Sequence, residues 1–155
     1  MEIQIAKTAH ILSAFLLCGA GFGLALRCLA SRVPRQMHVM LMSQSQLVLL
    51  DCLFTMPALV LQPLTGFWLA IVAGVPLTAP WMEASLALYA VTLGCNFAAL
   101  WLQGGMLDTA EAALRGESEL SARYHRHYRA WNILGWPAFA ATLAITVLMV
   151  VRPEW

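Results

Sequence analysis

The stretch KTAHILSAFLLCGAGFGLAL, residues 7–26, decides the fold class of this chain. After Lys7 and His10 it consists of apolar, small and hydroxylated residues. Its length matches the roughly 20 residues that a helix needs to cross a bilayer. Only Glu2 and Lys7 provide charge ahead of the apolar run, and the run is long enough to span. We therefore interpret it as a retained transmembrane helix and not as a cleaved signal peptide.

The composition of the whole chain points to the same class of protein. Of its 155 residues, 61% are hydrophobic and 11% are charged, whereas soluble domains are about 45–50% apolar and about 25% charged. So few charged residues cannot cover a soluble surface, but a bilayer accepts an apolar one. The net charge of +1 provides no basic field for nucleic acid. We predict an integral membrane protein whose partner is the lipid bilayer and which binds no nucleic acid.

Three further segments are long and apolar enough to span. With the first they predict an all-α, polytopic membrane protein, a single domain of four transmembrane helices in a bundle, at about 8–30, 46–73, 83–104 and 132–151. A polar stretch, residues 105–131, separates the third helix from the fourth. Its pattern predicts an interfacial helical segment between these two helices.

Positive charge lies mainly on one side of the four predicted helices. That side carries Arg27, Arg32, Arg35, Arg115, Arg123, Arg126 and Arg129. The other side carries only Lys7 and Arg152. Because positive loops favour the cytoplasm, we expect a multi-pass protein of the bacterial inner (plasma) membrane with both termini on the periplasmic side.

Each predicted helix has one polar or small face. The polar residues on these faces include Gln44, Asp51, Thr55 and Gln62 in the second helix and Ser85, Tyr89, Asn96 and Gln103 in the third. Polar groups are costly in lipid, so these faces should turn inward, where they pack the helices and bond across them. Asp51 lies about one turn inside the cytoplasmic boundary and is either an interfacial structural carboxylate or a buried functional one. Gln62 precedes Pro63, which should bend the helix and free a carbonyl.

His10 lies about one turn inside the outer boundary, and Lys7 can reach the surface from one turn further out. One interpretation is an interfacial histidine satisfied by a serine or a lipid headgroup. The other is a metal or haem ligand, because neutral imidazole commonly binds haem iron and helical bundles hold such cofactors. Met149, expected at the same depth, is a candidate second ligand, and Gln62 is a further candidate cofactor contact. A five-coordinate iron and a site shared between subunits are alternatives.

Four blocks of this sequence, in order and at similar spacing, resemble a bacterial family of predicted four-helix integral membrane proteins of unknown function. The blocks are KTAHIL (7–12), DCLFTMPALVLQPLTGFWLA (51–70), PWMEASLALYAV (80–91) and YRAWNILGWPAFAATLAITVLMVVRP (128–153). The resemblance covers nearly the whole chain, and it implies a membrane bundle without implying an activity.

More distantly, the chain is similar to HemJ-type protoporphyrinogen oxidases and copper-resistance D membrane proteins. The HemJ-type enzymes have a K-x-x-H-I block whose histidine binds haem, and Lys7, His10 and Ile11 match that block. The resemblance therefore implies haem b at His10. Their W-L-H-V-K block is different here, where Glu83 and Ser85 take the histidine and lysine positions. The resemblance thus does not carry over the oxidase activity.

These observations lead to one primary functional hypothesis and two alternatives. The primary hypothesis is b-type haem binding or electron transfer through His10. The first alternative is a small transport or metal-handling protein that uses Asp51 and Gln62. The second is a structural or assembly subunit, either in a homo-oligomer or with a membrane-complex partner. Soluble-enzyme motifs such as Walker A, GxSxG and HExxH are missing, so enzymatic activity is not the leading expectation.

Overall fold

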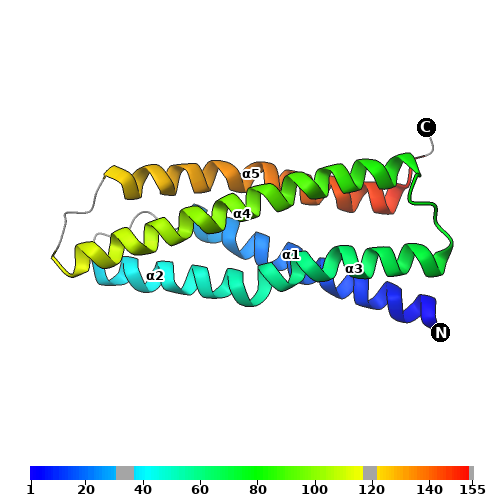
Figure 1. The fold of residues 1–155 in the computed structure, drawn as a ribbon, viewed down its shortest axis with the longest axis horizontal. Helices are drawn as coiled ribbons and strands as arrows, with labels where there is room; N and C mark the ends of the chain where they lie inside the picture. The colour runs from blue at the N-terminus through cyan, green and yellow to red at the C-terminus, as the bar shows by residue number, and fades with distance from the viewer. Residues whose placement is uncertain (31–36, 117–121, 154–155) are drawn as a thin grey trace.

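The computed structural model describes residues 1–30, 37–116 and 122–153, and within these ranges every regular element is a helix (Figure 1). In chain order they are α1 (Glu2–Ala30), α2 (Met37–Leu50), a short π-helix (Asp51–Thr55), α3 (Met56–Ala73), α4 (Pro80–Leu114) and α5 (Ala122–Val151). Four stretches are long and apolar enough to cross a membrane: Glu2–Gly23, Gln44–Ala73, Pro80–Leu114 and Ala122–Val151. The predicted all-α architecture with four spans is therefore confirmed.

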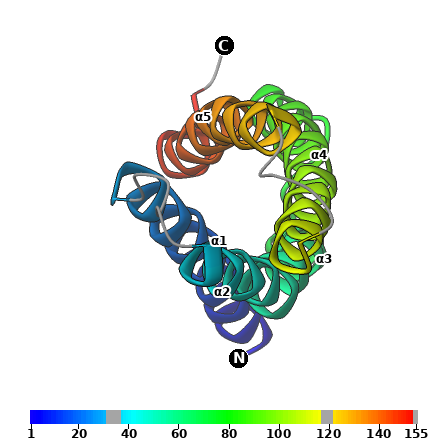
Figure 2. The ribbon, with the colours of Figure 1, turned by 90° about the vertical axis from the view of Figure 1, so that its left-hand side faces the viewer.

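The helices form an elongated bundle with antiparallel neighbours. The π-helix joins α2 to α3, so these three elements make one long rod, while α1 crosses α3 and α4 packs along α5 (Figure 1). Viewed from the end, the helices follow one another around a ring from α1 to α5 (Figure 2). The N-terminus, the turn at residues 74–79 and the end of α5 lie at the same end of the bundle (Figure 1). The start of α1 and the end of α5 therefore lie on the same side of a membrane that the bundle crosses.

The outer surface of the bundle is apolar, as a lipid-facing surface should be. Large hydrophobic side chains remain strongly exposed on different helices, among them Phe15, Ile71 and Trp101. The buried positions, in contrast, include polar residues on the second and third spans, such as Asp51, Thr55 and Gln103. Polar groups therefore lie inside the bundle and apolar groups outside it, which is the arrangement that a bilayer favours.

The polar stretch between the third and fourth spans is helical, but it does not form a separate interfacial segment in the described residues. Instead α4 continues to Leu114 and α5 already begins at Ala122. The reason is that this stretch is rich in Ala, Leu, Glu and Arg, which favour helix. It also keeps an apolar face, on which Met106, Ala110 and Tyr124 are buried. Helix propensity and side-chain packing thus extend both helices beyond the length that a bilayer requires.

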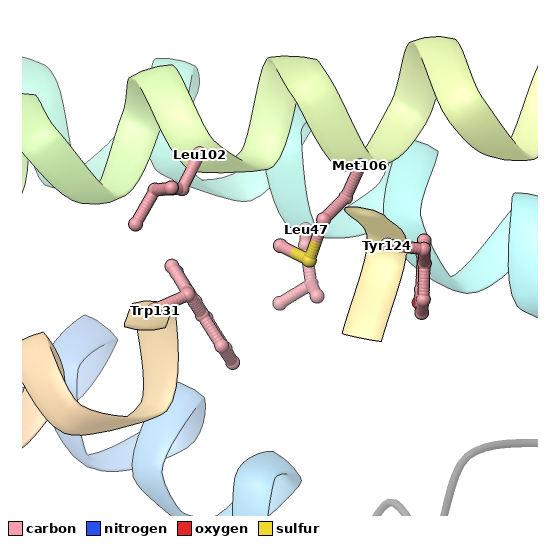
Figure 3. Close-up of a cluster of buried hydrophobic side chains, with 5 residues drawn as sticks. All are labelled: Leu47, Leu102, Met106, Tyr124 and Trp131. Carbon is pink, nitrogen blue, oxygen red and sulfur yellow. The ribbon is translucent and has the colours of Figure 1, made fainter. Parts of the chain in front are cut away.

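Two clusters of buried apolar residues hold the bundle together. The first, drawn in Figure 3, joins α2, α4 and α5 through Leu47, Leu102, Met106, Tyr124 and Trp131. The second joins α1 to α3 through Leu17, Ala58 and Leu59. Leu47 lies one turn before Asp51, and Ala58 lies nearly one turn after Thr55. The polar turn between Asp51 and Thr55 is therefore flanked by apolar packing along the rod.

The π-helix at Asp51–Thr55 is a local widening of the rod next to a proline. Its hydrogen bonding closes with the N–H of Met56 donating to the carbonyl of Asp51, a five-residue separation. Pro57 follows directly, and in an α-helix its ring would clash with the carbonyl four residues earlier. One extra residue in the turn relieves that clash, and π-bulges often occur at functional sites.

The second proline of the rod is compensated by a tyrosine from another helix. Pro63 lies inside α3 and has no N–H, so the carbonyl of Leu59, four residues earlier, has no helical donor. The hydroxyl of Tyr89 on α4 donates to this carbonyl. The sequence predicted that Pro63 would free a carbonyl, and the structure identifies Tyr89 as its partner. This bond ties α3 to α4 at mid-rod.

We predict that Tyr89→Phe lowers the free energy of unfolding by about 1–3 kcal/mol, because it leaves the Leu59 carbonyl buried without a donor. In a Pro63→Ala background, the introduced alanine supplies the missing N–H, so the same substitution should cost much less. Equilibrium unfolding of the four proteins in mixed detergent micelles measures both effects. An equal cost in the two backgrounds would contradict the assignment.

Candidate functional site

Asp51 is a buried carboxylate that is bound by neutral groups. Its side chain is 6% exposed, and it lies seven residues, about 10 Å of helix, inside the span that begins at Gln44. The hydroxyl of Thr55 donates to Oδ1 at 2.7 Å. The side-chain amide of Gln103 on α4 donates to Oδ2. Both carboxylate oxygens thus accept hydrogen bonds, as an ionised carboxylate does, but neither donor carries a charge.

Gln103 is the residue that links the rod to α4 at this site. It is 0% exposed, and its Oε1 atom has no hydrogen-bond partner in the described structure. The sequence places Gln103 on the polar face of its helix but does not connect it with Asp51, because residue periodicity does not reveal which helix a face meets. The consequence is a buried amide oxygen without a donor beside a buried carboxylate.

A second buried side-chain amide lies on the rod, two turns before Asp51 and on the same face. Gln44 is 4% exposed, and its Nε2 donates to the hydroxyl of Tyr124 on α5 at 2.8 Å. Its Oε1, like that of Gln103, has no partner among the described residues. The end of the bundle that carries the arginine-rich segments therefore has a second buried oxygen that is free to accept.

His10 lies in a polar seam between α1 and α3. Its Nδ1 is 3.1 Å from Oγ1 of Thr65, and its Nε2 is 3.4 Å from Nε2 of Gln62. The side-chain NH2 group of Gln62 can only donate, so Nε2 of His10 accepts and the proton of the neutral ring is on Nδ1, where it donates to Thr65. Ser13 completes the seam by donating to Oε1 of Gln62 at 2.6 Å. The imidazole thus links two helices with both of its nitrogens.

The tight contact between His10 and Gly66 explains why a glycine occupies that position in α3. A Cβ at Gly66 would lie 3.1 Å from Cε1 of His10 and 3.5 Å from Nδ1. The ring is therefore held against the α3 backbone, and both of its nitrogens are engaged by α3 side chains. In this arrangement neither nitrogen faces an open position, so the residues as placed do not fit a haem iron at His10.

The other residues singled out from the sequence are dispersed. Lys7 and Glu83 are exposed, and Met149 is half-buried on α5, outside the polar seam of His10. The hydroxyl of Ser85 donates to the carbonyl of Trp81, and the Asn96 amide donates to the carbonyl of Thr92, each within its own helix. Among the predicted residues, the structure brings together Asp51 with Thr55, and His10 with Gln62. Thr65, Ser13 and Gln103 complete these two groups.

Comparison with known proteins identifies the family. The family model DUF2269, described as a predicted integral membrane protein, matches residues 4–153. The chain therefore belongs to this family, and the resemblance to predicted integral membrane proteins of unknown function is confirmed. No curated protein and no solved structure matches the chain. The similarity to HemJ-type enzymes stays a prediction.

We predict that Gly66→Ala destabilises the protein by about 1–3 kcal/mol, because the added methyl group displaces the ring of His10 from its partners. In a His10→Ala background the space is free, so the same substitution should be tolerated. Thermal unfolding in detergent measures both. Gly94→Ala is the matched control, since nothing lies within 4 Å of its added Cβ, and it should be neutral or stabilising. Equal losses at positions 66 and 94 would contradict this account.

Proposed function

We propose that this member of the DUF2269 family carries small monovalent cations, protons included, across the membrane, and that Asp51 is the central binding group. The observation that supports this is the burial of its carboxylate inside a candidate span with only neutral partners, Thr55 and Gln103. Burying a charged group inside a transmembrane span is costly, up to about 2.5–3.5 kcal/mol at the helix centre on insertion scales, and such groups mark ion and proton pathways. A cation beside Asp51 would offset that cost.

The polar groups along the rod are consistent with a route on both sides of Asp51. Gln44 lies two turns toward the arginine-rich end, and Gln62 lies about three turns toward the chain termini. Between Thr55 and Gln62 the face of the rod is closed by the apolar cluster of Leu17, Ala58 and Leu59. Such a polar path with an apolar barrier is suited to a carrier, in which the barrier opens when helices shift, and less suited to an open pore.

The prolines supply places where such a shift can occur. Pro57 follows the π-helix, and Pro63 interrupts the hydrogen bonds of α3. Helix breaks next to an ion site are a common feature of membrane transporters, since they let one half-helix tilt against the other. Both breaks lie within the same span as Asp51 and Gln62. This geometry therefore favours the transport hypothesis over a purely structural role.

Haem binding at His10 is the second candidate from the sequence, and it requires the polar seam around His10 to rearrange. The neutral ring keeps its proton on Nδ1, so the lone pair on Nε2 is the one that an iron would take. In the structure that lone pair accepts from Gln62, and ligation requires Gln62 to turn away.

Assignment to the bacterial inner membrane and association with a second copy or a membrane-complex partner remain proposals that rest on the sequence.

We predict that the purified protein, reconstituted in lipid vesicles, dissipates an imposed Na⁺ or proton gradient. Asp51→Asn should slow the ion flux at least about tenfold. The loss of the negative charge weakens the attraction for a cation by more than about 1.4 kcal/mol, which corresponds to a tenfold change in rate. The introduced asparagine can accept from Thr55 through its oxygen and donate through its NH2 to Oε1 of Gln103 once that amide has turned, so the fold should persist. A dye enclosed in the vesicles, sensitive to pH or to Na⁺, reports the flux.

The matched control for this experiment is Asp108→Asn, which removes an exposed carboxylate from α4 and should leave the flux unchanged. Gln62→Ala tests the route beyond the apolar cluster and should reduce the flux. Wild-type vesicles that leak no faster than empty vesicles, for either ion, would refute the proposed function. An equal loss in the Asp51 and Asp108 variants would show that the effect is not specific to the buried site.

The haem hypothesis makes a separate prediction. The protein purified from haem-replete cells should then show a Soret band that responds to reduction, and His10→Ala should abolish it. Visible spectra of the oxidised and reduced proteins in detergent measure this. Met149→Leu tests the second ligand, since its loss changes the spectrum without removing the histidine. A featureless spectrum of the wild type would remove haem binding from consideration.

A further inference from the structure

We infer that Asp51, Thr55 and Gln103 form a binding site for a dehydrated monovalent metal cation of the size of Na⁺. This inference rests on the proposed function and narrows it, because it names the ion and its ligands. Its starting point is that the wholly buried Gln103 keeps an unpartnered oxygen directly beside a buried carboxylate.

The donor atoms of this site select a hard cation. Carboxylate, hydroxyl and amide oxygens are the ligands of Asp51, Thr55 and Gln103, and hard cations prefer oxygen. Nitrogen and sulfur ligands, which favour transition metals, are not among them. Within the described residues there is also no group of three or more His, Cys, Asp or Glu side chains placed to hold a metal. The ligand chemistry therefore points to a hard cation and not to a transition metal.

The charge of the site selects a monovalent ion. Asp51 contributes one negative charge, and the partners that bind it are neutral. A cation of charge +1 makes the complex neutral, which is the favourable state in a low-dielectric interior. A divalent ion would leave one uncompensated positive charge inside the bundle. The single carboxylate thus fits Na⁺ better than Ca²⁺ or Mg²⁺.

The Gln103 amide can serve the site both with and without a cation. As placed, its Nε2–H donates to Oδ2 of Asp51, and Oε1 has no partner. A half-turn of the amide places Oε1 where Nε2 was, so that Oε1 and Oδ2 both face the same point. A cation at that point satisfies both oxygens. The amide therefore replaces a hydrogen bond by a metal contact without any movement of the backbone.

The π-helix provides the remaining ligand chemistry in the same turn. Because Pro57 has no N–H, one carbonyl in the turn at residues 52–53 lacks its helical donor. Carbonyls released at breaks in membrane helices are ligands for Na⁺ in transporters. The carbonyl without a donor thus lies in the same π-helical turn as Asp51, whose carboxylate would attract the ion.

The test is the thermal stability of the purified protein in detergent, in NaCl and in choline chloride at equal ionic strength and pH. At ten times the Kd, Na⁺ should raise the Tm of the wild type by roughly 3–6 °C, in a saturable manner. Asp51→Asn and Gln103→Met should lose this rise. Asp108→Asn, which changes an exposed carboxylate, should keep it. Mg²⁺ should not replace Na⁺.

Equal Tm values for the wild type in the two salts would overturn the inference, and that comparison needs no variant to fold. A rise that persists in Asp51→Asn would also overturn it. Proton flux without any Na⁺-dependent stabilisation would refute this site while leaving the proposed function intact as proton transfer. Na⁺-dependent stabilisation without flux would support this site and refute the proposed function.

Discussion

The hydrogen bonds that hold the carboxylate of Asp51 fix how the α2–α3 rod faces the rest of the bundle. A carboxylate cannot face lipid without a large cost, so the rod must turn this side toward α4, where Gln103 meets it. Once the rotation of the rod about its axis is fixed, the other polar residues on the same face also point into the bundle. Gln44 then reaches Tyr124, and Gln62 reaches the seam with α1.

The same rotation of the rod determines what surrounds the backbone breaks at Pro57 and Pro63. A spanning helix must satisfy its backbone internally, and a proline leaves a carbonyl that some other group has to serve. At Pro63 the Tyr89 hydroxyl donates to it, which ties two helices together at the break. At Pro57 the rod instead widens into a π-helix beside Asp51. The carbonyl freed at one break is therefore bonded by a neighbouring side chain, and the other break lies beside the buried carboxylate.

The sequence was sufficient for the all-helical fold class and for the four apolar spans, because apolar length is a strong signal. It also identified the inward face of the rod, since Asp51, Thr55 and Gln62 recur at helical spacing. It could not pair Gln103 with Asp51 or His10 with Thr65, because periodicity gives the face of a helix but not the partner that this face meets. The π-helix was missed as well, since Pro57 predicts a disturbance but not the form that it takes.

The polar cluster around His10 and the polar cluster around Asp51 differ in whether each buried polar atom has a suitable partner. In the seam of His10, each ring nitrogen has a partner, and Gln62 is bonded through both its oxygen and its nitrogen. Such a closed set holds α1 against α3, and Gln62 can meet a cation only when its bonds to Ser13 and His10 open. The cluster at Asp51 is incomplete in two ways. The negative charge of the carboxylate has only neutral partners, and the buried Oε1 of Gln103 has no hydrogen-bond partner. An open set in a low-dielectric interior is stabilised by a positive ion, and the ability to accept one is what distinguishes a binding site from a packing contact.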